Sequence, residues 1–143
     1  MAYAYITQLD LDTGIFRTLQ HERNDEDTVA ILENIELQNI ELIKTKLNGR
    51  YDIDAIFQAT GINRHYLIIK ILTALIVYDF IRRNAARKVP KDATEDWEWA
   101  MKLLEQIKSG KETPDGLPDA VSENGDTIER LLWKNNKNKD FYI

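Results

Sequence analysis

The sequence contains no cysteine, so it can form neither a disulfide nor a thiolate metal site. It has only three prolines and six glycines among 143 residues, which leaves room for long uninterrupted helices. The longest apolar run, residues 66–78, is interrupted by Lys70 and is shorter than the roughly 20 residues of a membrane span. The opening stretch MAYAYITQLD lacks the basic and apolar regions of a signal peptide. These shortages predict a protein that works without disulfides and without a membrane.

The net charge of −5 is distributed unevenly along the chain. Residues 1–50 carry nine acids and five bases, residues 51–90 three acids and six bases, and residues 91–143 twelve acids and eight bases. A basic middle between two acidic ends disfavours a general attraction to nucleic acid. It favours contacts between a basic face and an acidic face of neighbouring copies.

Apolar residues recur at helical spacing in three long segments, residues 25–48, 63–86 and 93–109. Gly49 and Gly110 follow the first and the third segment, where a glycine typically ends a helix. No segment shows a convincing strand pattern. The predicted fold class is therefore all-α, a small bundle of three long helices plus short helical turns, in a domain of residues 1–110.

Polar residues at the starts of these segments suggest helix caps. Thr7 is the expected N-cap of a short helical turn, Asn63 caps the second long helix, and Asp92 with Glu95 has capping-box spacing for the third. The short turns are expected at residues 8–12, 15–20 and 54–59.

The composition changes after Gly110. The stretch KETPDGLPDAVSENG contains two prolines and two glycines and little that could fill a core, which predicts an extended arm over residues 111–143. A short amphipathic helix is expected at residues 127–134. Six apolar residues of the arm are costly to leave in water, since burying one such side chain gains about 1.5–3 kcal/mol: Leu131, Leu132, Trp133, Phe141, Tyr142 and Ile143. The arm is expected to be mobile in the isolated chain and to become ordered on a partner.

Catalytic and metal motifs are weak. Residues 11–14, Leu-Asp-Thr-Gly, match the core of the aspartic-protease signature, but that chemistry needs two such carboxylates on a β-rich frame, and helical periodicity contradicts the frame. Asp10 and the residues after it resemble a calcium loop, but His21 stands where the terminal glutamate belongs. His21 and His65 have no partners at metal-ligand spacing. We therefore predict no enzyme, no catalytic residue, no metal site and no cofactor.

Residues 56–71 have the layout of a helix-turn-helix, with Gly61 in the turn. A DNA-reading second helix must present polar side chains to the groove, whereas this one reads LIIKILTALIVY. DNA binding is thus an alternative rather than the preferred interpretation.

Four bases gather after the central apolar segment: Arg82, Arg83, Arg87 and Lys88. Cations at that position stabilise a helix C-terminus, and they can equally face a partner. Both readings stay open. Trp99 falls on the helix face opposite to the apolar stripe, so it is expected to be exposed or to lie at an interface.

The order of these elements resembles a known family. An acidic-capped helix ends in leucine, a small residue, glycine and Arg50-Tyr51; a long apolar helix with arginines at its end follows; then residues 100–111 read A-x-x-L-L-x-x-I-x-x-G-K. Over residues 5–115 the sequence is similar to the small all-helical head–tail connector (adaptor) proteins of tailed bacteriophages.

The resemblance implies a structural virion protein at the portal–tail junction, which resides in the host cytoplasm during assembly. Such a protein forms a dodecameric ring beneath the portal protein, extends the channel for genomic DNA without sequence-specific contact, and binds the tail or a further connector ring. The arm would then dock on the portal or on an adjacent ring. The alternative function is a small helical DNA-binding or packaging accessory protein.

Arg50 and Tyr51 allow two interpretations within this family. Tyr51 can lie against the bundle with its hydroxyl at the rim, while Arg50 reaches exposed carbonyls at the end of the first long helix or an acid on a neighbouring copy. An intrachain clasp at the helix exit is preferred over a contact across the ring, because cations commonly bind helix C-termini.

Overall fold

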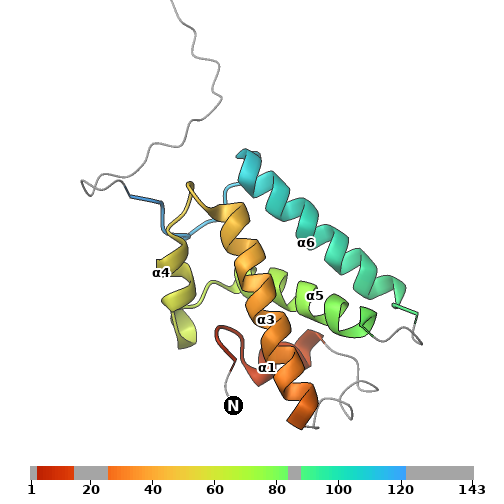
Figure 1. Ribbon diagram of the computed structural model, residues 1–143. Coiled ribbons are helices and arrows are strands. Elements are labelled where there is room, and N and C mark those ends of the chain that lie inside the picture. The colour runs from red at the N-terminus through yellow and green to blue at the C-terminus, as the bar shows by residue number, and fades with distance from the viewer. Residues whose placement is uncertain (1–2, 15–25, 84–87, 122–143) are drawn as a thin grey trace, which may run out of the picture.

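Three long helices, crossing one another around one apolar core, dominate the computed structural model, which describes residues 3–14, 26–83 and 88–121 (Figure 1). In chain order the elements are α1 (Gln8–Gly14), α3 (Glu26–Leu47), α4 (Ile53–Gln58), the 3-10 helix η1 (Gly61–Asn63), α5 (Tyr66–Arg82) and α6 (Lys91–Ser109). The described residues contain no β-sheet and one pair of residues joined as an isolated bridge. The predicted all-α bundle of three long helices is confirmed. The turn expected at residues 15–20 lies outside the described residues.

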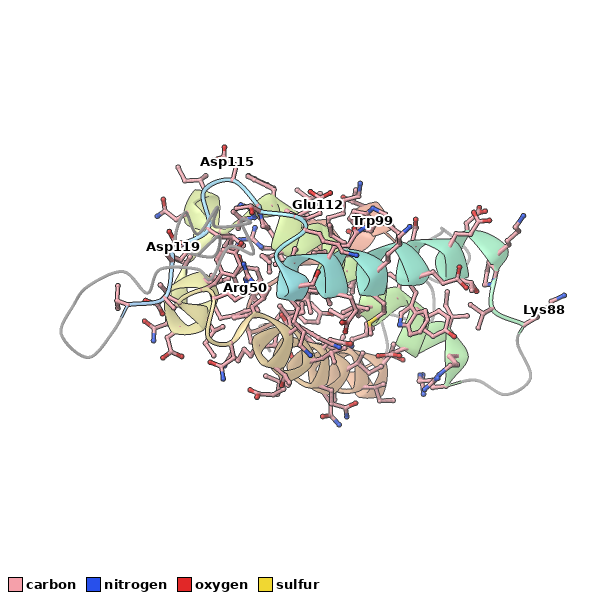
Figure 2. The ribbon with its side chains drawn as sticks, turned by 90° about the horizontal axis from the view of Figure 1, so that it is seen from above. Arg50, Lys88, Trp99, Glu112, Asp115 and Asp119 are labelled. Atoms are coloured by element: carbon pink, nitrogen blue, oxygen red, sulfur yellow. The ribbon has the colours of Figure 1, made fainter. Side chains whose placement is uncertain are left out.

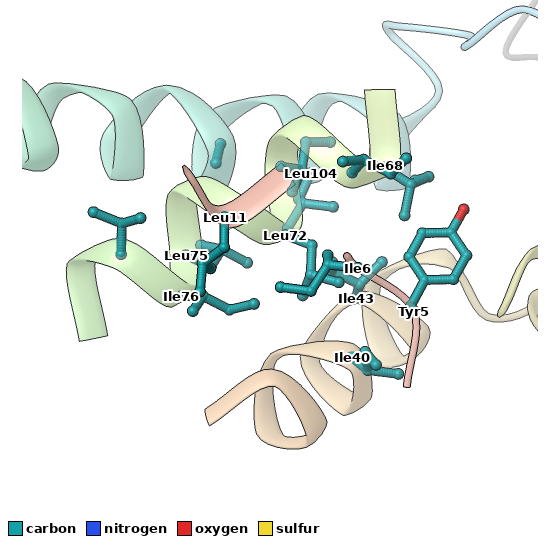
Figure 3. Packing of buried hydrophobic residues seen from close by; sticks show 14 of the residues in the cluster. Tyr5, Ile6, Leu11, Ile40, Ile43, Ile68, Leu72, Leu75, Ile76 and Leu104 are labelled. Carbon is teal, nitrogen blue, oxygen red and sulfur yellow. The ribbon is translucent and has the colours of Figure 1, made fainter. Parts of the chain in front are cut away.

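Helix α5 forms the centre of the bundle because it is apolar on nearly every side. Ten of its 17 residues are buried, and it packs against α1, α3 and α6. Leu72, Leu75 and Ile76 meet side chains from the other elements in one continuous core (Figure 3). Burial on several faces is what a helix without a polar stripe requires.

Helices α3 and α6 are amphipathic and cover the central helix. In α3 the buried positions recur every three or four residues, at Leu32, Glu36, Ile40, Ile43 and Leu47. The spacing matches one helix face, which therefore turns toward α5. Figure 1 shows α3 passing across α5 and α6 lying alongside it, with α4 at one end of the bundle.

Helix α1 begins with the expected cap. The backbone N–H of Asp10 donates to Oγ1 of Thr7 at 3.3 Å, and the backbone N–H of Thr7 donates to Oδ2 of Asp10 at 2.8 Å. Two otherwise unpaired amides of the helix start are satisfied reciprocally, as in a capping box. The short helix then extends to Gly14, two residues beyond the expected end.

Two predicted caps were wrong. Asn63 lies inside η1, and α5 begins later, at Tyr66, after His65 in the cap position. Asp92 and Glu95 lie within α6, which begins at Lys91 directly after Pro90. Pro90 has φ −57 and ψ 145 and occupies the cap position without a side-chain hydrogen bond, so the helix begins before the predicted capping box.

Residues 111–121, which follow α6, form no helix and pack on the bundle. Leu117 is buried in the core, although the sequence predicted that this stretch holds little that could fill it. The backbone N–H of Asp52 donates to the carbonyl of Pro118 at 2.9 Å, and that of Ala120 donates to the carbonyl of Arg50 at 3.3 Å. Residues 111–121 are therefore part of the bundle. The prediction of an arm that is mobile from residue 111 onward is wrong for these residues. The expected helix at residues 127–134 lies outside the described residues.

No helix in the described part of the chain is long and apolar enough to cross a membrane.

Candidate functional site

A buried carboxylate joins the N-terminal segment to α3. The side chain of Glu36 is 1% exposed, and it accepts hydrogen bonds from the backbone N–H groups of Ala4 and Tyr5, each at 2.8 Å, and of Ile6 at 2.9 Å. Three amide donors converging on one carboxylate compensate for its removal from water. The N-terminal segment is thereby fixed against α3.

A second polar cluster joins the same segment to the start of α5. Nη1 of Arg64 donates to Oδ2 of Asp10 at 2.7 Å and to the carbonyl of Tyr5 at 2.9 Å. The hydroxyl of Tyr5 accepts from the backbone N–H of His65 at 3.0 Å. Burial raises the pKa of the Tyr5 phenol above its ordinary value, since the anion would lose its hydration. This cluster fixes α1 against the central helix.

The Asp10–Arg64 pair gives the fold a dependence on pH. Although burial alone would raise the pKa of Asp10, hydrogen bonds from Arg64 and Thr7 hold it below its ordinary value of 3.8. A carboxyl with a lowered folded-state pKa stabilises the fold above the unfolded-state value, and this stability is lost as pH falls through the folded-state pKa. Both side chains are largely buried: that of Arg64 is 11% exposed and that of Asp10 is 15% exposed.

Replacing Asp10 by asparagine is expected to lower the free energy of unfolding at pH 7 by about 2 kcal/mol, because a charge-assisted pair is lost. The gap between variant and parent should shrink as pH falls below the ordinary pKa of the carboxyl. Urea unfolding at several pH values measures it. Asp54→Asn, at an exposed position, should change stability by less than about 0.5 kcal/mol. A gap that stays constant into strongly acidic solution would contradict the assignment.

Arg50 binds the C-terminal end of α6, whereas the sequence predicted that it would reach the carbonyls at the end of the first long helix, α3. Its Nη1 donates to the carbonyl of Lys108 at 3.3 Å, in the last turn of α6. A Cβ added at Gly110 would lie 2.8 Å from Nη2 and 3.0 Å from Nη1 of Arg50. The guanidinium therefore lies directly over the helix C-terminus, where the carbonyls and the helix dipole favour a cation (Figure 2). The intrachain clasp is present, and its target is the third long helix.

Tyr51 lies inside the bundle beside this clasp. Its side chain is buried, and its backbone pairs with Asp119 as an antiparallel bridge. The ring is thus not available to a partner, which corrects its assignment to a partner interface. Arg50 and Tyr51 together bind the end of α6 and the returning segment of residues 117–120.

Gly110 has φ +81, which costs an alanine about 1 kcal/mol, and alanine there must also displace Arg50. We expect Gly110→Ala to destabilise the protein by about 2 kcal/mol, and by less in an Arg50→Met background where the guanidinium is gone. Gly116→Ala is the matched control, because φ is +77 and nothing lies within 4 Å of the added Cβ. Thermal unfolding of the double-mutant cycle measures the coupling; equal costs in both backgrounds would refute the contact.

The predicted basic cluster lies at the other end of α6 from Arg50. Arg82 and Arg83 are exposed at the C-terminus of α5, and Lys88 is exposed before α6 (Figure 2). The guanidinium carbon of Arg82 lies 5.8 Å from the ring centroid of Tyr78, and that of Arg83 lies 4.9 Å from that of Phe80. Cation–π contacts and the helix terminus account for part of their placement, and their charge remains accessible. Arg87 lies outside the described residues.

A groove of about 500 Å³ runs between α1, α5 and α6. Its lining residues are Asp10, Thr13, Tyr66, Ile69, Lys70, Thr73, Ala74, Val77, Asp92, Ala93, Asp96 and Trp99. As predicted, Trp99 lies away from the core stripe of α6 and is exposed, whereas Trp97 packs on the core and stacks on Tyr78 at 4.8 Å between centroids. Trp99 therefore forms one wall of the groove.

The described residues offer no group of three or more His, Asp or Glu side chains arranged to hold a metal ion. The Leu-Asp-Thr-Gly motif lies in helix α1, without the β frame that a protease requires. His65 contacts the carbonyl of Asp115, at 2.6 Å from Nε2, and so belongs to the docking of the returning segment. His21 and the six apolar arm residues, Leu131, Leu132, Trp133, Phe141, Tyr142 and Ile143, lie outside the described residues.

Sequence reasoning missed Glu36, the Asp10–Arg64 pair and the groove. Glu36 had a signal, because it lies four residues from both Leu32 and Ile40 on the buried face of α3. A charged residue in an apolar stripe requires a polar partner. The other two features bring together residues more than fifty positions apart, for which periodicity gives no indication.

Comparison of the chain with protein-family models, with curated proteins and with solved structures finds no match.

Proposed function

We propose that this chain is a head–tail connector (adaptor) of a tailed bacteriophage. Copies would assemble into a ring, dodecameric by resemblance, beneath the portal protein. The ring would extend the channel through which genomic DNA passes and would join the capsid to the tail or to a further connector ring.

The observation that carries the proposal is the contact between the two sequence motifs behind the resemblance. Arg50 of the Gly-Arg-Tyr motif lies on Gly110, the glycine of the A-x-x-L-L-x-x-I-x-x-G-K motif. The two motifs lie about sixty residues apart in the sequence, and in the fold they form one contact. That agreement favours a common fold with the connectors over independent chance matches.

The helix-turn-helix alternative receives less support. The second helix of that arrangement would be α5, and ten of its 17 residues are buried against α1, α3 and α6. A recognition helix needs a free polar face to enter the major groove. What still favours a DNA-binding accessory protein is the exposed charge of Arg82, Arg83 and Lys88.

The direct test combines the purified chain with the portal protein of the same genome. A connector is expected to form rings with a central channel in electron micrographs and to sediment with portal rings. A chain that stays monomeric and does not bind the portal refutes the proposal. A gel shift of duplex DNA that weakens steeply with salt supports the accessory-protein alternative.

The basic cluster gives a sharper variant. Arg82→Glu with Arg83→Glu is expected to weaken ring assembly about tenfold at low salt while leaving the monomer folded, because an exposed basic face would lose its acidic partner. Native mass spectrometry in the presence of the portal measures assembly. Lys102→Glu with Lys111→Glu is the matched control, with the same change of charge on exposed residues elsewhere. Unchanged assembly would mean that the two arginines only stabilise the C-terminus of α5 and do not contact a neighbouring copy.

A further inference from the structure

The groove between α1, α5 and α6 combines an apolar floor with an acidic rim. Ile69, Ala74 and Val77 of α5 line it between the other two helices. Asp92 and Asp96 line it from the first turns of α6, and both are exposed. Its volume of about 500 Å³ is within the range of ligand and peptide sites.

Two aromatic side chains in the groove remain accessible to solvent. Trp99 is 37% exposed and Tyr66 is 68% exposed. The Nζ atom of Lys70 lies 4.8 Å from the ring centroid of Trp99, which holds the indole in place. Accessible aromatic residues beside an apolar floor are typical of an interface, since tryptophan and tyrosine contribute most to binding energy.

The side chain of Thr73 lies in this floor with its hydroxyl oxygen buried. The residue is 8% exposed and lines the groove, and its Oγ1 has no hydrogen-bond partner among the described residues. That oxygen is almost inaccessible, so a docked group could reach it only after the side chain rotates. The groove therefore fits a segment that is apolar on one side and positively charged on the other.

The chain itself contains such a segment. Residues 127–139, TIERLLWKNNKNK, carry four bases and one acid around Leu131, Leu132 and Trp133. Ile128, Leu131 and Leu132 have the i, i+3, i+4 spacing of one helix face. We propose that residues 127–139 of a second copy of this chain occupy the groove, with their apolar face on α5 and Trp99 and their bases against Asp92 and Asp96.

Geometry favours a second copy over the same chain. The backbone N–H of Ala120 donates to the carbonyl of Arg50, beyond the C-terminal end of α6, whereas Asp92, Asp96 and Trp99 line the groove from the N-terminal half of that helix. The Tyr66 end of the groove lies nearer to the returning segment, because the neighbouring His65 contacts Asp115. From Gly110 back to Trp99 is about 16 Å of helix at 1.5 Å per residue. The six steps from Val121 to Thr127 span at most about 20 Å, so a segment of the same chain reaches Trp99 and the two aspartates with almost no slack. A segment donated to a neighbour makes a head-to-tail contact, which is what builds a ring.

The inference rests on the proposed function only in that a ring needs a head-to-tail contact. Its tests use the pure chain without a portal. A chain that self-associates through this groove and ignores the portal would refute the connector proposal and leave the inference standing.

The first test is a charge swap between copies. We expect Asp92→Lys with Asp96→Lys in one chain, and Arg130→Glu with Lys134→Glu in another, each to weaken self-association about tenfold, because like charges then meet at the rim. An equimolar mixture should regain association, since the reversed segment of one chain matches the reversed groove of the other. Sedimentation velocity at low salt measures the mass.

The matched control is Glu98→Lys with Glu112→Lys, which changes the charge equally on exposed residues outside the groove and should leave association unchanged (Figure 2). Circular dichroism verifies folding of each variant. Wild-type chain that stays monomeric, variants that associate like wild type, or a mixture that does not recover would each overturn the proposal.

The second test exploits the absence of native cysteine. A chain with Ala74→Cys in the groove is mixed with a chain carrying Leu132→Cys, and oxidation is expected to join them as a mixed disulfide dimer. Glu98→Cys replaces the groove cysteine in the control and should give at least tenfold less mixed dimer, since proximity governs the yield. Equal yields overturn the proposal. A chain that carries both Ala74→Cys and Leu132→Cys provides a further check at a dilution at which copies rarely meet. If it forms a disulfide within itself, the proposal is overturned, because the groove then binds the segment of its own chain.

Discussion

Replacing Leu75 by aspartate is expected to prevent folding. The side chain of Leu75 is fully buried at the centre of α5, where the core of all the long helices meets (Figure 3). An unpaired carboxylate there would cost several kcal/mol beyond the lost apolar contacts. That penalty is comparable with the whole stability of a domain, about 5–15 kcal/mol. Far-UV circular dichroism and urea unfolding should find no cooperative transition near neutral pH.

The control uses the same substitution at an exposed leucine. Leu37 is 53% exposed on α3, so Leu37→Asp should shift the free energy of unfolding by less than about 1 kcal/mol. If Leu75→Asp unfolds with the midpoint of the wild type, the central position of α5 is wrong.

Replacing Glu36 by alanine is expected to lower the free energy of unfolding by about 3–5 kcal/mol. The change leaves three amide donors, of Ala4, Tyr5 and Ile6, without their acceptor. It also removes the connection between the N-terminal segment and α3. Hydrogen exchange should accelerate at the amides of Tyr5 and Ile6 well before global unfolding, because those groups lose their protection.

Glutamine at the same position tests the charge separately. Glu36→Gln keeps the volume and one acceptor oxygen but turns an NH₂ group toward backbone donors, so most of the loss should persist. Glu41→Gln is the matched control on the solvent side of α3, where the side chain is 73% exposed and pairs with Lys44, and a change under about 0.5 kcal/mol is expected. If Glu36→Gln and Glu41→Gln lower the free energy of unfolding by similar amounts, the carboxylate of Glu36 does not have the structural role assigned to it.

These two sites illustrate different sources of specificity. The apolar core around Leu75 rewards any arrangement that buries the same helix faces. The carboxylate of Glu36 accepts only the one arrangement in which the N-terminal amides reach it, at 2.8–2.9 Å. Polar contacts of this kind fix the path of a short segment that has little apolar surface of its own.

The Arg50 clasp connects the fold to the proposed function. It brings the exit of α3, the end of α6 and the returning segment of residues 117–120 to one joint. The residues that follow Val121 therefore start from a fixed place on the bundle. A donated segment needs such an origin, because the effective concentration of a tethered segment depends on where the tether begins.

Local sequence determined the helices. The 3.6-residue periodicity and the glycines at positions 49 and 110 fixed the three long helices to within about three residues at most ends. The Thr7–Asp10 cap was also readable, because both partners lie within one turn. The caps at Asn63 and at Asp92 were not, since His65 and Pro90 occupy the cap positions instead. Capping residues are common in loops, and only the path of the chain selects among them.

Tertiary structure decided everything that joins distant residues. Periodicity predicts that a face is buried, and it does not say against what. The partners of Glu36 lie about thirty positions away, and those of Arg50 lie more than fifty positions away. The groove arises only because α1 and α6 pack on either side of one stretch of α5. Sequence by itself determined which segments are helical, because helix formation depends on neighbours within one turn. The packing of those helices determined the clasp, the buried carboxylate and the groove, because such contacts depend on surfaces that exist only once the bundle has formed.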